Sequence, residues 1–247
     1  MNLKSTLLQL NERYKIIIST KKYSGLEPFL YAYILMTEKL IEENNKVKML
    51  FKDPDKIVSL DATLANDYLE ITDKVLNKES AQSPWSNYFN YCSNTDGSRI
   101  LQLLLGVNTH INYSLVVENI SQGKINHDDF FKMNDVLIAI IPQIHDYFLN
   151  TGNPGFLKLT KPFLWIIKPV IKQYILTFVK TAWKNIEYIS RSSKKDTLLN
   201  KLKQKVEDNA LKIIKLYNLI NNPKALLSPW NIYKLFNLNS ELYLEKE

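Results

Sequence analysis

The sequence predicts an all-α protein, a single-domain helical bundle of about 8–10 helices. Only six glycines and nine prolines occur in 247 residues, too few for the turns that a sandwich or barrel of many strands needs. Hydrophobic residues make up 45% and charged residues 23% of the chain, which is typical of a globular protein with a sizeable core. We therefore expect residues 1–247 to form one domain.

Apolar residues at helical spacing predict three helices in the first third of the chain. The first covers residues 3–20. The second covers residues 28–41, and Pro28 suits the first turn of a helix. The third covers residues 53–75, where Asp53 and Pro54 form a typical helix start.

Residues 98–120 predict a buried central helix, which follows a short helical segment near Trp85. No side chain from Ile100 to Val117 is charged when His110 is neutral, and leucine, valine and isoleucine residues cover almost every direction around the helix axis. A helix that is apolar all round belongs in the interior of a protein.

The second half of the chain predicts further helices. One is expected from Asn126 to Ile144, and Pro142 should kink it or end it early. A break follows at Asn153-Pro154-Gly155. Two or three later helices are expected, at about 156–179, 182–190 and 198–219, with a short last helix around Trp230 and Phe236.

Four polar residues interrupt the central apolar segment: Asn108, His110, Asn112 and Ser114. A buried polar group without a partner costs about 1–3 kcal/mol, so we expect a polar network. On a regular helix His110 and Ser114 share one side, and the two asparagines lie opposite. We therefore expect at least one pair to be structural. Gly106 leaves room beside His110 for either a crossing helix or a ligand.

Asp61, Asp129 and Asn134 are the polar residues that we expect to join His110. In one interpretation they form a small-molecule site, with His110 as acid/base or polar anchor and the two aspartates as catalytic carboxyls. Asn108, Asn112, Ser114 and Asn134 would then bind the ligand. In the other interpretation they form a hydrogen-bonded core network. The first predicts a cleft beside Gly106, with Asp61, Asp129 or Asn134 within hydrogen-bond reach of His110. The second predicts a packed interior without a cavity, where His110 bonds to the backbone.

Neither a metal site nor a cofactor site is indicated. The only histidines are His110, His127 and His145, and no H-E-x-x-H or E-x-x-H pattern occurs. Cys92 is the only cysteine, and nothing around it marks a nucleophile. There is no glycine-rich phosphate loop. We predict no metal, and the sequence leaves any cofactor unknown.

The C-terminal half, residues 155–221, is basic. From Lys158 to Lys215 there are fourteen lysines or arginines and four acidic residues. An alternative function is therefore a non-catalytic binding or scaffold protein that uses this surface, with weak contact to an anionic membrane surface. Only three arginines occur in the whole chain and no nucleic-acid motif is present, so we expect no specific nucleic-acid binding.

The chain is expected to lie in the cytoplasm. A lone cysteine and the absence of a secretory signal in the first residues suit a reducing compartment. The longest apolar candidate for a membrane span, Phe163–Val179, contains Lys168 and Lys172 in its middle. Because charges are costly in hydrocarbon, we expect no transmembrane segment.

The chain resembles domain-of-unknown-function family 5995, a mostly bacterial and all-helical group. The match is strongest from Leu103 to Leu115, where LLLGVNTHINYSL stands against a family motif of roughly L-L-G-x-N-A-H-I-N-x-D-L. Weaker matches extend the resemblance over about residues 55–190: Leu60, Asp61, Ala65, Tyr68, Leu69, Trp85, Phe89, Asp129, Phe130, Asn134 and Trp183.

The resemblance implies that Asn108, His110, Asn112, Asp129 and Asn134 belong to one constellation. This sequence departs from the family pattern at two positions. Thr109 replaces an alanine, and Ser114 replaces an aspartate. If that aspartate orients the histidine or binds a cation, activity here is altered or lost. The family has no established reaction to carry over.

Overall fold

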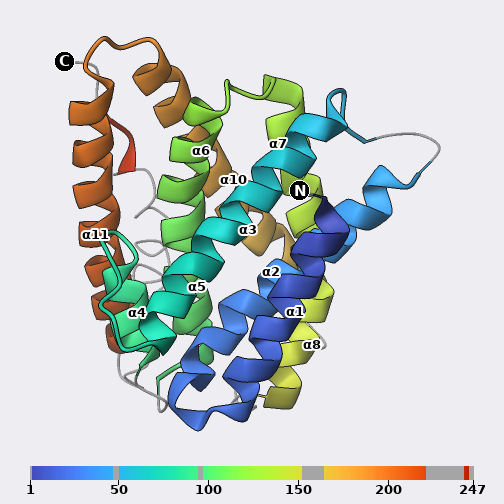
Figure 1. Cartoon of the computed structure of the whole chain (residues 1–247), viewed down its shortest axis with the longest axis vertical. Coiled ribbons are helices and arrows are strands. Elements are labelled where there is room, and N and C mark those ends of the chain that lie inside the picture. The colour runs from blue at the N-terminus through green and yellow to red at the C-terminus, as the bar shows by residue number, and fades with distance from the viewer. Residues whose placement is uncertain (1, 47–49, 94–96, 152–163, 221–241, 245–247) are drawn as a thin grey trace.

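The computed structural model describes residues 2–46, 50–93, 97–151, 164–220 and 242–244 (Figure 1). These residues are largely helical and include no strand, so the predicted all-α class is confirmed. The predicted break at residues 153–155 and the predicted short helix around Trp230 and Phe236 lie outside the described residues.

The first three helices begin at residues that cap them well. Helix α1 (Leu3–Ser19) starts after Asn2, which accepts a hydrogen bond from the Ser5 N–H. A 3₁₀ helix (Lys21–Leu26), not predicted from the sequence, leads into α2 (Glu27–Asn44). Helix α3 (Pro54–Leu76) starts after Asp53, which accepts from the Lys56 N–H. The three predicted helices are confirmed.

The central helix is continuous but not regular. After α4 (Ser86–Cys92), helix α5 (Arg99–Thr109) leads into a π-helical turn (His110–Ser114) and then α6 (Leu115–Ser121). At this turn the Leu115 N–H donates to the carbonyl of His110, five residues back. The prediction of a helix over residues 98–120 is confirmed, and the assumption of regular α-helical geometry is wrong at the turn.

Two helices of the second half differ from their predicted bounds. Helix α7 (His127–Ala139) ends before Pro142, which lies in the first turn of α8 (Ile141–Thr151), where a missing N–H does no harm. Helix α10 (Leu164–Ser190) has no break near residue 180, so of the two or three helices expected between residues 156 and 219, 156–179 and 182–190 are not separate in the described part. Neither glycine nor proline occurs near that point, and Thr181 is buried.

The helices surround the central column of α5, the π-turn and α6 (Figure 1). Helices α2 and α11 (Lys195–Ile220) pack on α5, and α10 packs on the π-turn, α6 and α7. In Figure 1 α3 crosses in front of the column and α11 runs alongside it. The π-turn therefore lies where several helices meet.

One helix in the described part of the chain, Arg99–Ser121, is long and apolar enough to cross a membrane. Its most apolar stretch is 56% buried within the structure, and the core helix of a globular protein has the same composition. This degree of burial is typical of a core helix, so the length and composition of Arg99–Ser121 are only weak evidence for a membrane span.

Candidate functional site: an apolar cavity at the π-turn

A cavity of about 180 Å³ lies beside the π-turn. Its walls come from α2, α3, α5, α6, α7, α8 and α10. Most lining side chains are leucine, isoleucine, valine, methionine or phenylalanine, whereas Tyr33, Asp61, His110 and Asn134 are the polar ones. The cavity is therefore chiefly apolar, and Gly106 is not among the residues that line it.

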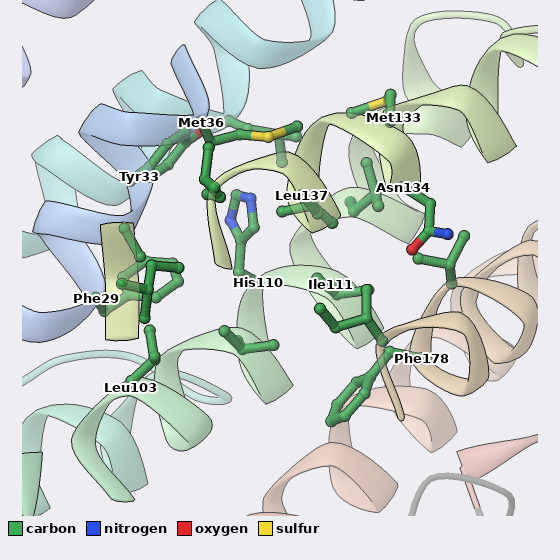
Figure 2. A pocket seen from close by; sticks show the side chains of 18 of the residues that line it. Phe29, Tyr33, Met36, Leu103, His110, Ile111, Met133, Asn134, Leu137 and Phe178 are labelled. Carbon is green, nitrogen blue, oxygen red and sulfur yellow. The ribbon is translucent and has the colours of Figure 1, made fainter. Parts of the chain in front are cut away.

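His110 points into this cavity. Figure 2 shows its ring between Tyr33 and Met36 of α2 on one side and Leu137 of α7 on the other. The ring centroid lies 4.9 Å from that of Tyr33 and 5.6 Å from that of Phe29, both in edge-to-face geometry. Its Nδ1 is buried without a hydrogen-bond partner in the described structure. Burial lowers the pKa of His110 to about 4, so the ring is neutral at pH 7.

Gly106 makes room for a crossing helix. A Cβ at this position would lie 2.5 Å from ring atoms of Phe29, a residue of α2. Phe29 in turn contacts the His110 ring. Of the two roles considered for Gly106, close packing of α2 on α5 is therefore the one seen, and it sets one wall of the cavity.

Asp61 lies in the same cavity as His110. The side chain is 3% exposed, and its Oδ2 accepts a hydrogen bond from Thr37 Oγ1 at 3.2 Å. Tyr33 donates its hydroxyl to the backbone carbonyl of Asp61, also at 3.2 Å. Burial raises the pKa of Asp61 to about 7, although the Thr37 hydrogen bond opposes this. The carboxyl group therefore changes charge near neutral pH.

Asn134 is the third polar group predicted for the site that lines the cavity. It lies on the far side of Leu137 from His110 in Figure 2, towards Phe178 of α10. Its Oδ1 is buried and has no hydrogen-bond partner among the described residues. Asn134 and His110 thus border one apolar space without bonding to each other in the described structure.

Asn108 and Asn112 face away from the cavity, towards α11. Asn108 donates from Nδ2 to the Val206 carbonyl at 3.2 Å. Its Oδ1 accepts from Asn112 at 3.2 Å and from Asn209 at 2.7 Å. Both asparagines of the central helix are buried. Asn108 therefore joins α5 to α11, Asn112 of the π-turn bonds to Asn108, and neither residue lines the cavity.

Ser114 and Asp129 have structural partners outside the cavity. The Ser114 hydroxyl accepts from Trp85 Nε1 at 3.2 Å. Asp129 accepts from the backbone N–H groups of Lys52 and Asp53 at 2.8 and 2.9 Å, and from Asn126 Nδ2 at 2.7 Å. Burial alone would raise the pKa of Asp129, but these hydrogen bonds lower it. Asp129 therefore anchors the segment before α3, and the predicted convergence on His110 does not include it.

The sequence analysis did not identify several residues of the cavity and of the asparagine network. Phe29, Tyr33 and Met36 form one face of α2, at spacings of three and four residues. That pattern identifies a buried face but gives no indication that a cavity lies against it. Asn209 was missed because a single asparagine in a long amphipathic helix is unremarkable. No group of histidine, cysteine and carboxylate side chains suited to a metal occurs among the described residues.

The chain matches, over residues 5–216, the model of a family described as Family of unknown function (DUF5995). The chain belongs to this family. The match extends on both sides of the region from about 55 to 190 in which the sequence motifs were recognised. Comparison with curated proteins gave no match, and comparison with solved structures gave none either. Membership alone therefore supplies no reaction.

The use of the basic residues 155–221 as a binding surface remains a prediction. Lys172, Lys180 and Lys184 of α10 are exposed. Arg191 lies 3.6 Å from Glu187, which also pairs with Lys124. These contacts occupy part of the basic surface but do not identify a partner for it.

Proposed function

We propose that this protein binds a small, largely apolar molecule in the cavity at the π-turn, with His110 and Asp61 as its polar contacts. The observation that carries the proposal is the cavity itself, about 180 Å³ in volume, with His110 on its wall and the His110 Nδ1 buried without a partner. A fully packed core would instead fill that space.

The size of the cavity limits the ligand. An apolar cavity of about 150 Å³ is known to bind benzene, so this one suits a single-ring or short alkyl molecule. π-Turns inside α-helices occur frequently at functional sites, where they redirect side chains. Here the turn carries His110.

The pKa values of His110 and Asp61 indicate different roles for these two groups. His110 is neutral at pH 7, which suits a hydrogen-bonding anchor better than a proton donor. Asp61, with a pKa of about 7, is the group suited to proton exchange with a bound molecule. Any catalysis in this cavity would therefore depend on Asp61, with His110 orienting the ligand.

The proposal is tested by filling the cavity. Benzyl alcohol should raise the melting temperature of the parent protein in a saturable manner, because it binds the folded state only. Leu137→Trp should abolish this increase by occupying the space beside His110. Leu211→Trp is the matched control, because Leu211 is 56% exposed and lies outside the cavity lining. The absence of any effect of benzyl alcohol on the parent protein would contradict the proposal.

A further inference from the structure

The cavity contains one carboxyl group and no cationic side chain among the described residues that line it. In the described structure the only hydrogen bond to the Asp61 carboxyl comes from Thr37. The other titratable groups facing it across the cavity are Tyr33 of α2 and His110 of the π-turn. Tyr33 remains protonated because burial and the nearby Asp61 raise its pKa.

An ionised carboxylate in such a place needs a countercharge. Without one, the charged form loses the solvation that water gave it, and the group stays protonated instead. Two aromatic residues, Phe29 and Tyr33, line the same cavity as Asp61. Aromatic faces attract cations, and this attraction is stronger where water is excluded.

We propose that the ligand of this cavity is a small primary amine with an aromatic or short alkyl body, whose ammonium group pairs with Asp61. The inference rests on the proposed function, because it names the ligand class for the same cavity. The apolar walls would hold the body of the amine, and Asp61 would supply the one negative charge. His110, whose Nδ1 has no partner in the described structure, is the further polar group on the wall of this cavity.

The affinity for an amine should depend on pH, whereas the affinity for a neutral ligand should not. Asp61 is mostly protonated below its pKa of about 7 and mostly ionised above it. An alkyl ammonium group stays protonated well above pH 8, as a lysine side chain does with its pKa of about 10.4. Affinity for an amine should therefore rise between about pH 5.5 and pH 8 by about tenfold or more.

Benzylamine and benzyl alcohol are a matched pair of probes, since they differ in one group. Calorimetric titration of the parent protein should give tighter benzylamine binding at about pH 8 than at about pH 5.5, by about tenfold or more, and nearly constant benzyl alcohol binding. Asp61→Asn should remove the pH-dependent gain for benzylamine and retain benzyl alcohol binding. Asp67→Asn is the control, because Asp67 lies on the same helix, outside the cavity lining. Its pKa is also raised, to about 6, by burial and by Glu118.

The possible outcomes distinguish a failure of the amine inference alone from a failure of both the inference and the proposed function. Binding of benzyl alcohol with benzylamine that is no tighter at high pH would overturn the amine inference and leave the proposed function intact. An equal loss of the pH-dependent gain in Asp67→Asn would also overturn it. If neither probe binds the parent protein, the inference and the proposed function both fail.

Discussion

His110 and Asp61 line one cavity but affect stability in opposite directions as pH changes. The pKa of His110 is lowered from 6.5 to about 4, so between these values the unfolded chain binds more protons at His110 than the folded protein does. The free energy of unfolding therefore falls as the pH drops from about 6.5 to about 4. The pKa of Asp61 is raised from 3.8 to about 7, so the folded state keeps its proton longer and stability falls as pH rises from about 4 to 7. In the parent protein the two effects largely offset each other.

Single substitutions should separate the two effects. His110→Gln should leave a protein whose stability falls more steeply with rising pH than that of the parent. Asp61→Asn should do the reverse, because only the histidine effect remains. Each difference from the parent should reach about 2 kcal/mol across the window. Urea unfolding at several pH values between 4 and 7 measures it, and variants with unchanged pH profiles would show that neither group is desolvated as described.

Asp129 should behave as a structural residue. Asp129→Ala leaves the Lys52 and Asp53 N–H groups without their acceptor and should cost about 2–4 kcal/mol of unfolding free energy. The neighbouring Asp128 pairs with the Lys52 side chain at the surface, so Asp128→Ala should leave stability unchanged within error. Equal effects of the two substitutions, measured by urea unfolding, would contradict the anchoring role.

At the scale of elements, the asparagine network joins the π-turn to α11. Asn108 bonds to Val206, Asn112 and Asn209, so the removal of Asn108 should cost about 2–3 kcal/mol. Asn209→Ala should cost less, because one of these bonds is lost. The double variant should be more stable than additivity predicts, by about 1 kcal/mol, since both changes remove the same contact. Strictly additive unfolding free energies would indicate that the two residues do not interact.

Helix starts were predictable from sequence because single residues determine them. Asp53, Pro54 and Pro28 satisfy or remove N–H groups of a first helical turn, and this chemistry is visible without a structure. The π-turn was not predictable, because it depends on how α10 and α11 pack against the central column. The sequence left open whether a break occurs near residue 180, and α10 is continuous there because no glycine or proline occurs near that point.

Part of the candidate site was predicted from polar residues that interrupt an apolar helix face. His110, Asp61 and Asn134 were selected on that basis, and the structure places all three around one cavity. Asp129 and Asn112 were also predicted for the site, but Asp129 bonds to the Lys52 and Asp53 N–H groups and Asn112 bonds to Asn108 of the same helical column. Sequence periodicity gives the direction of a side chain but not the identity of the group that it meets across a helix interface.

At the scale of the whole molecule, the helices enclose a small space beside their central column and leave the His110 ring facing it. Two of the four methionines, Met36 of α2 and Met133 of α7, line this space. Their methyl groups therefore report on it directly, without any change to the polar residues. Substituting each of the two by leucine in turn assigns their resonances.

Titration of benzyl alcohol into protein labelled with ¹³C at the methionine methyls is the most direct measurement of ligand binding in the cavity. The structure predicts saturable shifts of the Met36 and Met133 resonances, with one affinity for both, and loss of both shifts in Leu137→Trp. Unmoved resonances at millimolar probe, or shifts that persist in Leu137→Trp, would contradict the assignment of this cavity as a binding site.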